Sequence, residues 1–459
     1  MFTRHFPWLI GVTACAAFTG ACATNDSIDN GRGMDASVDA KVVVDSGQHT
    51  MDSGQQQMVD PRPEIYPTNR TQSPLTKKVV QSMTAIAAKA NRADDVFAKI
   101  GDSITVNTNF FACFAGANVD LGTHADLGDA RSFFGAGSAG GVSPFSRVSA
   151  SAAVGWSAFK ALEGDPSPLE QEIATTNARF GVVMYGTNDI GLKDLDQYAD
   201  NMLTITDTLI GSGVVPILSS IPPRAIAVDD PLWVDRANTV VRGIAQARMV
   251  PFVDYHREMV GLFNQGLGGD STHPSVYTPN GEKGCLLTAD GLAYGYNVRN
   301  WVTLEALSRA KDVLVDDEEF LDAPAGHMDG TGTHTDPYIV GSLPFTHIGD
   351  TSKSSERRIS QYTGCSATQN ESGPEVYYAI DVTDTVTVSA FVLDRGNVDI
   401  DVHALQGTAD ANSCVQRNHI GITETLTPAR WYFALDTFVD ESNVELKGEY
   451  MFALLVEED

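Results

Sequence analysis

The fold is set by residues 96–104, which read VFAKIGDSI. A short apolar run ends here in Gly-Asp-Ser-Ile, and the residues that follow are expected to continue as a helix. Four further apolar runs of similar length lie at 147–154, 180–185, 214–219 and 250–253. Continuous apolar runs separated by helical stretches are typical of parallel strands that helices bury on both faces. The sequence therefore predicts an α/β fold.

Helices are expected around these strands, because the apolar spacing over 71–90, 195–210, 232–249 and 292–314 is helical. The stretch 105–146 is long for a simple crossover. It carries phenylalanines at 110, 111, 114, 133, 134 and 145. It forms either an extra helix with its own hydrophobic cluster or a lid that shapes an apolar pocket. We expect packing, because aromatic residues in insertions more often anchor them.

The chain changes character around residues 323–326, APAG, where Gly, Thr, His and Asp accumulate. Beyond this point, short strands are predicted at 338–343, 375–382, 385–393, 398–405, 422–426, 431–435 and 450–454. Such spacing is typical of an all-β sandwich. Because 459 residues exceed the usual size of one core, we expect two units. These are an α/β domain over 63–322 and a β-sandwich domain over 335–459.

The N-terminus predicts export. Residues 1–22 combine a positive start at Arg4, an apolar stretch and small residues before Cys22, which is the pattern of a signal peptide. The stretch 19–22, TGAC, resembles a bacterial lipoprotein cleavage box, so we expect Cys22 to carry a lipid; ordinary signal cleavage is the alternative. Residues 23–62 predict a disordered acidic tether. The protein would then lie at the outer membrane or cell surface, or otherwise in the periplasm or medium.

The net charge limits the partners that we expect, and the cysteines indicate the compartment. The chain has 59 acidic and 31 basic residues, a formal net charge of -28, which opposes binding to nucleic acid. Membrane contact is expected only through the lipid anchor. Outside the signal peptide, Cys113, Cys285, Cys365 and Cys414 allow three disulfide pairings in an oxidising compartment. The domain boundary favours the first with the second and the third with the fourth. No Cys-x-x-Cys pair occurs, so a structural zinc site is not expected.

Polar residues suited to catalysis follow the strands, at the edge where open α/β sheets place their sites. Ser103 lies at an expected helix N-terminus, whose free N–H groups stabilise an alkoxide and an oxyanion. Asn188, within Gly-Thr-Asn-Asp after a later strand, offers an amide N–H to the same oxyanion. Asp270 and His273 share one loop, so the carboxylate can orient the imidazole. Each segment alone is common cap or loop chemistry, but together they form a hydrolase set.

These segments resemble the sequence blocks of the SGNH or GDSL-like lipases and acylhydrolases, over about residues 93–315. Residues 101–104 match the nucleophile block, with Ile104 where Leu is usual. Residues 186–189 match the third block, and Asp270 with His273 the fifth. For the oxyanion glycine of the second block Gly155 is the best match, and the glycines at 135, 137, 140 and 141 are alternatives. The resemblance implies a flavodoxin-like three-layer αβα sandwich that requires no metal or organic cofactor.

The β-rich tail resembles bacterial pre-peptidase C-terminal domains. The resemblance rests on residues 371–375, ESGPE, and 398–402, VDIDV. Asp399 and Asp401 alternate on one predicted strand face, so with Asp394 they could bind calcium. A solvated face is the favoured interpretation.

The sequence thus predicts an exported serine esterase that acts on a small-molecule or polymer-borne ester. Ser103 would attack the carbonyl, His273 would take its proton, and Asp270 would hold His273 in place. The N–H groups of Ser103 and Gly155 and the amide of Asn188 would receive the oxyanion. Two alternatives remain: a surface protein that binds glycan or matrix with little turnover, and a peptidase.

Overall fold

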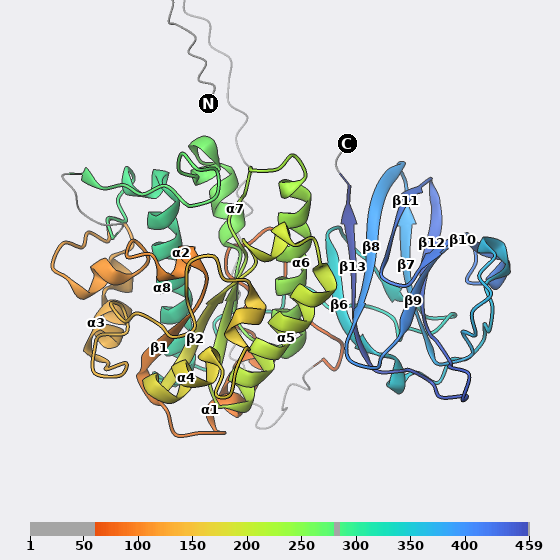
Figure 1. Cartoon of the computed structure of the whole chain (residues 1–459), viewed down its shortest axis with the longest axis horizontal. Coiled ribbons are helices and arrows are strands. Elements are labelled where there is room, and N and C mark those ends of the chain that lie inside the picture. Colours follow the sequence, from red (N-terminus) through yellow and green to blue (C-terminus); the bar gives the residue numbers. More distant parts are fainter. Residues whose placement is uncertain (1–59, 280–284, 458–459) are drawn as a thin grey trace, which may run out of the picture. The chain divides into compact units, whose positions relative to one another are not determined.

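Strands and helices alternate in the first part of the chain (Figure 1). The computed structural model describes residues 60–279 and 285–457, so the predicted signal peptide, the tether up to residue 59 and Cys22 lie outside the described residues. Four strands pair in chain order and all in parallel: β1 (Ala93–Gly101), β2 (Ala178–Met184), β3 (Val215–Ser219) and β4 (Phe252–Val253). Their side chains are almost all buried. The predicted parallel sheet is confirmed.

Helices cover both faces of this sheet. Helices α5 (Leu195–Gly211) and α6 (Asp230–Arg248) pack together on one face, and α1 (Lys77–Ala87) and α8 (Gly295–Leu314) pack on the other. Two shorter helices are α4 (Pro168–Thr176), beside β1, and α7 (Tyr255–Val260), beside α8. The three-layer α/β architecture is therefore as expected from the sequence.

One expected strand does not form. Residues 147–154 lie beside β1, where the N–H of Gly101 donates to the carbonyl of Ser151 (3.0 Å), but the contact is an isolated bridge rather than a ladder. The hydroxyl of Ser149 accepts the N–H of Ser151 (3.0 Å). Such local side-chain hydrogen bonds give the backbone an alternative to a sheet. The segment therefore follows the sheet edge as a turn.

The insertion between β1 and β2 packs onto the sheet. It begins with α2 (Ser103–Val106) and contains α3 (Gly128–Ala136). The helix predicted after Ser103 is only one turn long, because the side chain of Asn107 accepts the N–H of Asn109 (2.9 Å) in a local turn. The ring of Phe97 on β1 meets three rings of the insertion at centroid distances of 5.3 to 5.6 Å, from Phe111, Phe134 and Phe145. All four rings are fully buried, which favours packing over a lid.

The second part of the chain is a β-sandwich. One sheet has the order β10-β9-β12-β7-β5 and the other has the order β11-β8-β13-β6. The strands are β5 (Tyr338–Ile339), β6 (Phe345–Asp350), β7 (Glu375–Val382), β8 (Val386–Asp394), β9 (Ile400–Gln406), β10 (Cys414–Asn418), β11 (Gly421–Leu426), β12 (Ala429–Thr437) and β13 (Glu449–Val456). Strands β6 and β10 were not predicted. Alternate residues such as Val402, Phe433 and Phe452 form the core.

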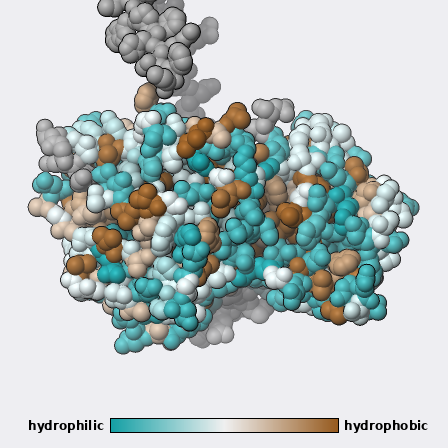
Figure 2. All heavy atoms as spheres, viewed as in Figure 1, coloured by the Kyte–Doolittle hydropathy of each residue, from teal (hydrophilic) through white to brown (hydrophobic). Residues whose placement is uncertain are grey.

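Both expected disulfides are present, Cys113–Cys285 in the α/β part and Cys365–Cys414 in the sandwich. Figure 2 shows a mainly hydrophilic face with hydrophobic residues in small groups. Among the described residues, no helix has both the length and the apolar character needed to cross a membrane.

Helix α6 also packs against β6 and β13 of the sandwich. Gly243 permits this approach, because a Cβ there would lie 2.3 Å from Oγ1 of Thr346. The side chain of Gln246 donates to the carbonyl of Thr346 (3.0 Å). Arg248 donates to Asp207 and to Glu449, at 2.7 Å each. The α/β and β-sandwich parts therefore share a polar and apolar interface.

Candidate active site

The turn that carries Ser103 is tightly packed. Gly101 ends β1, and a Cβ on it would lie 2.3 Å from Oγ1 of Thr105 and 2.4 Å from the carbonyl of Met184, so a side chain does not fit there. Asp102 caps α2, with its Oδ1 accepting the N–H of Ile104 (2.9 Å). Ser103 is the first residue of this one-turn helix. A helix of one turn has only a small dipole. Stabilisation of negative charge at Ser103 would therefore depend on the local backbone N–H groups rather than on a helix dipole.

The three predicted catalytic residues meet. Oγ of Ser103 lies 2.8 Å from Nε2 of His273, and Nδ1 of His273 lies 2.7 Å from Oδ2 of Asp270. Ser103 and His273 are 170 residues apart in the sequence. With the proton on Nδ1, the imidazole accepts from the serine and donates to the carboxylate, which is the arrangement of a nucleophile, base and orienting group.

The loop that carries the base is held by Asp270 itself. Its Oδ1 accepts the N–H groups of Thr272 (3.1 Å) and His273 (2.9 Å), while Oδ2 faces the ring. Partial burial opposes ionisation, but the hydrogen bonds from the His273 backbone and ring prevail and lower the pKa of Asp270. The side chains of His273 and Asp270 are 38% and 57% exposed, so this half of the site is open to water.

The two other predicted oxyanion residues come from adjoining segments. Gly155 lies in a turn at φ +77°, a conformation that favours glycine, and its N–H is a backbone donor. The side chain of Asn188 donates to the carbonyl of Trp156 (2.9 Å) through one of its two amide hydrogens. The carboxylate of Asp189 accepts the N–H of Ala158 (2.8 Å). These two hydrogen bonds hold residues 155–158 against residues 186–189.

Two buried carboxyl groups support these segments, and neither was singled out from the sequence. Burial raises the pKa of Asp102 to about 6 and that of Asp189 to about 7. Both belong to the short motifs that were recognised, but an Asp in a turn gives no sign in the sequence that it is buried.

A buried arginine lies beneath the nucleophile. Arg299 of α8 donates to the carbonyl of Ile104 (2.7 Å) and to Oγ1 of Thr105 (2.8 Å). Its guanidinium lies 3.7 Å from the centre of the Phe110 ring. Arg299 thereby satisfies a backbone carbonyl of α2 and fixes the turn that carries Ser103 to α8. Its position in an ordinary helical pattern gave no signal in the sequence.

The groups of side chains with metal-ligand spacing, among the described residues, lie in the β-sandwich. They combine Asp401 with Glu371 and His403, or with Asp399 and His419, and they leave out Asp394. The carboxylate of Asp394 instead accepts the N–H of Ile400 (2.9 Å). The trio considered for calcium is therefore not the one that the structure brings together.

Comparison with known proteins gives likeness to solved structures alone. No protein-family model matches the chain, and no curated protein matches it. A GDSL-like lipase from Bacteroides thetaiotaomicron is 18% identical, with a TM-score of 0.32, over 51% of this chain and 98% of that one. A catalytic mutant of an acetylxylan esterase from Geobacillus stearothermophilus is 17% identical, with a TM-score of 0.31, over 47% and 95%. The pre-peptidase C-terminal domain of a collagenase from Bacillus anthracis is 15% identical, with a TM-score of 0.17, over 25% and 91%. The chain is thus similar in part to GDSL-like hydrolases and in part to a pre-peptidase C-terminal domain.

Proposed function

We propose that this chain is a serine hydrolase that cleaves carboxylic esters. The observation that carries the proposal is the continuous hydrogen-bonded chain from Ser103 through His273 to Asp270, at 2.8 and 2.7 Å. These residues come from two segments that are far apart in the sequence. A role as a helix cap or loop residue would explain each residue by itself. Such roles do not explain why a hydroxyl, an imidazole and a carboxylate are joined in sequence by hydrogen bonds.

The reaction follows from the roles of these groups. His273 accepts the proton of Ser103 as Oγ bonds to the ester carbonyl carbon, and Asp270 stabilises the imidazolium. The oxyanion receives hydrogen bonds from the N–H groups of Ser103 and Gly155 and from the second amide hydrogen of Asn188. The tetrahedral intermediate then expels the alcohol, which takes the proton from His273 and leaves an acyl-enzyme.

Deacylation repeats these steps with water as the nucleophile. His273 takes a proton from water as the water oxygen bonds to the acyl carbon. The tetrahedral intermediate then breaks its bond to Oγ of Ser103, which takes the proton back from His273 as the acid is released. The chain's own residues supply every proton transfer. The open surface around His273 and Asp270 gives water access to the acyl-enzyme.

Export and lipid anchoring at Cys22 are part of the same proposal. The two disulfides support an oxidising compartment, where such bonds persist. The substrate would then be an ester outside the cytoplasm, either a small molecule or an ester group on a polymer. The substrate's acyl chain length and its alcohol are left to measurement.

A fluorophosphonate probe and an ester panel test the proposal. We expect the probe to label wild-type protein at Ser103 and to leave Ser103→Ala unlabelled. Ser132→Ala, which removes an exposed hydroxyl from α3, should label like the wild type. Hydrolysis of acetyl to palmitoyl p-nitrophenyl esters should fall at least 10³-fold in Ser103→Ala.

Equal hydrolysis by wild type and Ser103→Ala, with matching melting temperatures, would refute the proposal. Cleavage of peptide amides without cleavage of esters would replace it with a peptidase. Binding of glycan without labelling or turnover would replace it with a binding role.

A further inference from the structure

A polar cluster is buried on the outer face of the five-stranded sheet of the sandwich. Along β9, Val402 and Ala404 point into the sandwich core, so Asp401 and His403 point to the opposite face. Glu371 approaches them from the segment that precedes β7. Glu371 and His403 are 0% exposed and Asp401 is 3% exposed, because residues 359–371 cover this face.

The covering segment is fixed in place. The Cys365–Cys414 disulfide ties it to β10, the neighbour of β9. The ring of Tyr362 stacks on the ring of His403, with 3.6 Å between centroids and 16° between planes. The orientation of the imidazole is therefore set before any ligand arrives.

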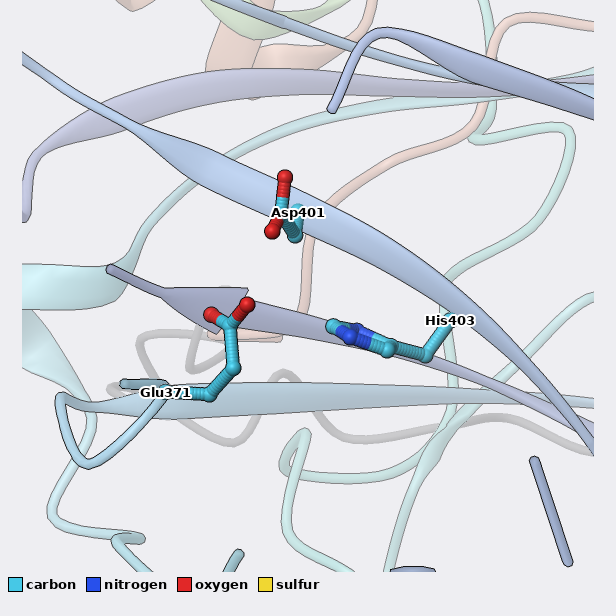
Figure 3. Close-up of side chains that lie close together, drawn as sticks. All are labelled: Glu371, Asp401 and His403. Carbon is cyan, nitrogen blue, oxygen red and sulfur yellow. The ribbon is translucent and has the colours of Figure 1, made fainter. Parts of the chain in front are cut away.

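The three side chains offer one ligand atom each within 4.8 Å of one another. Figure 3 shows the carboxylate of Glu371 and the ring of His403 pointing toward each other, with Asp401 next to them. Among the described residues, Oε2 of Glu371 has no hydrogen-bond partner, and neither nitrogen of His403 has one of normal geometry, although the backbone of Ala434 lies near the ring. Buried polar atoms in folded proteins are nearly always paired, so this orphaned set points to a ligand.

The charge of the cluster points to a cation. Nη2 of Arg417 contacts Asp401 and lies 3.4 Å from Oε1 of Glu371, so it leaves Oε2 free. Asp436, which is fully buried, lies opposite Asp401 on β12. The guanidinium of Arg417 thus contacts two buried carboxyl groups, while His419 lies 3.5 Å from the other oxygen of Asp401. Asp436 accepts the hydroxyl of Tyr362 (2.8 Å) and lies beside the buried Glu375. Burial disfavours charge on these carboxyl groups, and a divalent cation would stabilise their ionised form.

We propose that Glu371, Asp401 and His403 bind one divalent transition-metal ion of the zinc type. Imidazole together with carboxylates suits zinc-like ions, whereas calcium prefers ligand sets made of oxygen atoms. Zinc ligands at about 2.1 Å lie roughly 3.4 Å apart, so the three atoms need to close by on the order of 1 Å. Water would complete the coordination. The ion would hold the covering segment to β9, a structural role apart from ester hydrolysis.

Metal binding by the full chain tests this site. Protein stripped with a chelator and titrated with ZnCl₂ should bind one equivalent with a Kd in the micromolar range or below, and should retain it through gel filtration. The melting temperature should rise with Zn²⁺ and not with Ca²⁺ at the same concentration. X-ray absorption at the zinc edge of wild-type protein should show one imidazole ligand, a readout that requires no variant.

Variants locate the ion. Glu371→Gln and His403→Gln should each lower the affinity for Zn²⁺ at least tenfold. His419→Gln serves as the matched control, because the exposed His419 belongs to the alternative group with Asp399 and Asp401 and its loss should leave the affinity unchanged. Ester hydrolysis by Glu371→Gln should equal that of the wild type, which separates this site from the active site.

Three results would overturn the assignment. These are the absence of retained zinc, a zinc-edge spectrum without imidazole, and loss of binding in His419→Gln with normal binding in Glu371→Gln. The last result would place the ion at the group of Asp399, Asp401 and His419 instead.

Discussion

Replacement of Asp270 by Asn tests the geometry of the catalytic loop most directly. In the wild type, Oδ1 accepts two backbone N–H groups, from Thr272 and His273, and Oδ2 faces Nδ1 of the ring. An asparagine amide has only one acceptor oxygen, and the backbone donors will hold it in the Oδ1 position. The NH₂ group must then face Nδ1. It would stabilise the tautomer whose proton lies on Nε2, where the ring cannot accept from Ser103.

The magnitude follows from two losses. Two unit charges about 4 Å apart interact by about 1 kcal/mol in water and about 4 kcal/mol at a protein surface, and the 57% exposed carboxylate belongs between these limits. The misdirected amide hydrogen bond adds about 1 kcal/mol. The total of about 3 to 4 kcal/mol corresponds to a loss of roughly 10²- to 10³-fold in kcat/KM, less than the 10⁴-fold known for a buried triad carboxylate.

Asp270→Ala is the informative companion, because it removes the carboxylate without presenting a donor to Nδ1. Water can then serve the exposed ring, so we expect a smaller loss than in Asp270→Asn. The assay is kcat/KM for p-nitrophenyl acetate at pH 8, with melting temperatures to confirm folding. A larger loss in Asp270→Ala than in Asp270→Asn, or less than a threefold loss in both, would refute this reasoning.

Three further changes probe the supports of the site. Asn188→Ala should lower kcat by about 10² to 10³ with little change in KM, because the amide is needed for the transition-state oxyanion; a change below threefold in steady-state kinetics would exclude that role. Asp189→Asn should gain on the order of 3 kcal/mol of stability relative to wild type between pH 4 and pH 8, measured by urea unfolding. The sign follows because the folded-state pKa of about 7 lies above the usual 3.8, so the wild type loses stability as pH rises through this window; a constant difference would contradict it. Cys113→Ser combined with Cys285→Ser should cost about 2 to 5 kcal/mol of unfolding free energy, because the bond closes a loop across 172 positions. The cost would be near zero if the phenylalanine cluster alone held the insertion.

The sequence was most informative where function depends on local order. Asp270 and His273 lie three residues apart, so their loop could be interpreted without knowledge of the fold. Ser103 and Asn188 follow buried strands, and parallel strands bring their carboxyl ends to one edge. The run 147–154 was misassigned, because its small apolar residues suit a strand and a turn equally well. Its backbone hydrogen bonds, not its composition, decide between them.

Long-range contacts between polar residues were not predictable. Arg299 looks like any helical arginine, and its burial beneath α2 depends on how α8 packs. Strands β6 and β10 carry polar residues on one side and so lack a clear apolar run. Glu371 and His403 meet only because the covering segment folds back over β9, which local patterns do not encode. Asp401 stands out in the sequence, but the local pattern groups it with Asp394 and Asp399, its neighbours along the chain.

The junction at Gly243 limits how this protein can be shortened. A fragment of the α/β part that ends near residue 334 would expose the surface of α6 at Gly243 that contacts Thr346, and would leave Arg248 without Glu449. Such a fragment should be prone to self-association. In the full chain, a bulky residue at position 243 should weaken the contact between the α/β part and the β-sandwich. We therefore expect the sandwich to stabilise the α/β part, so that removing it would lower the stability of what remains.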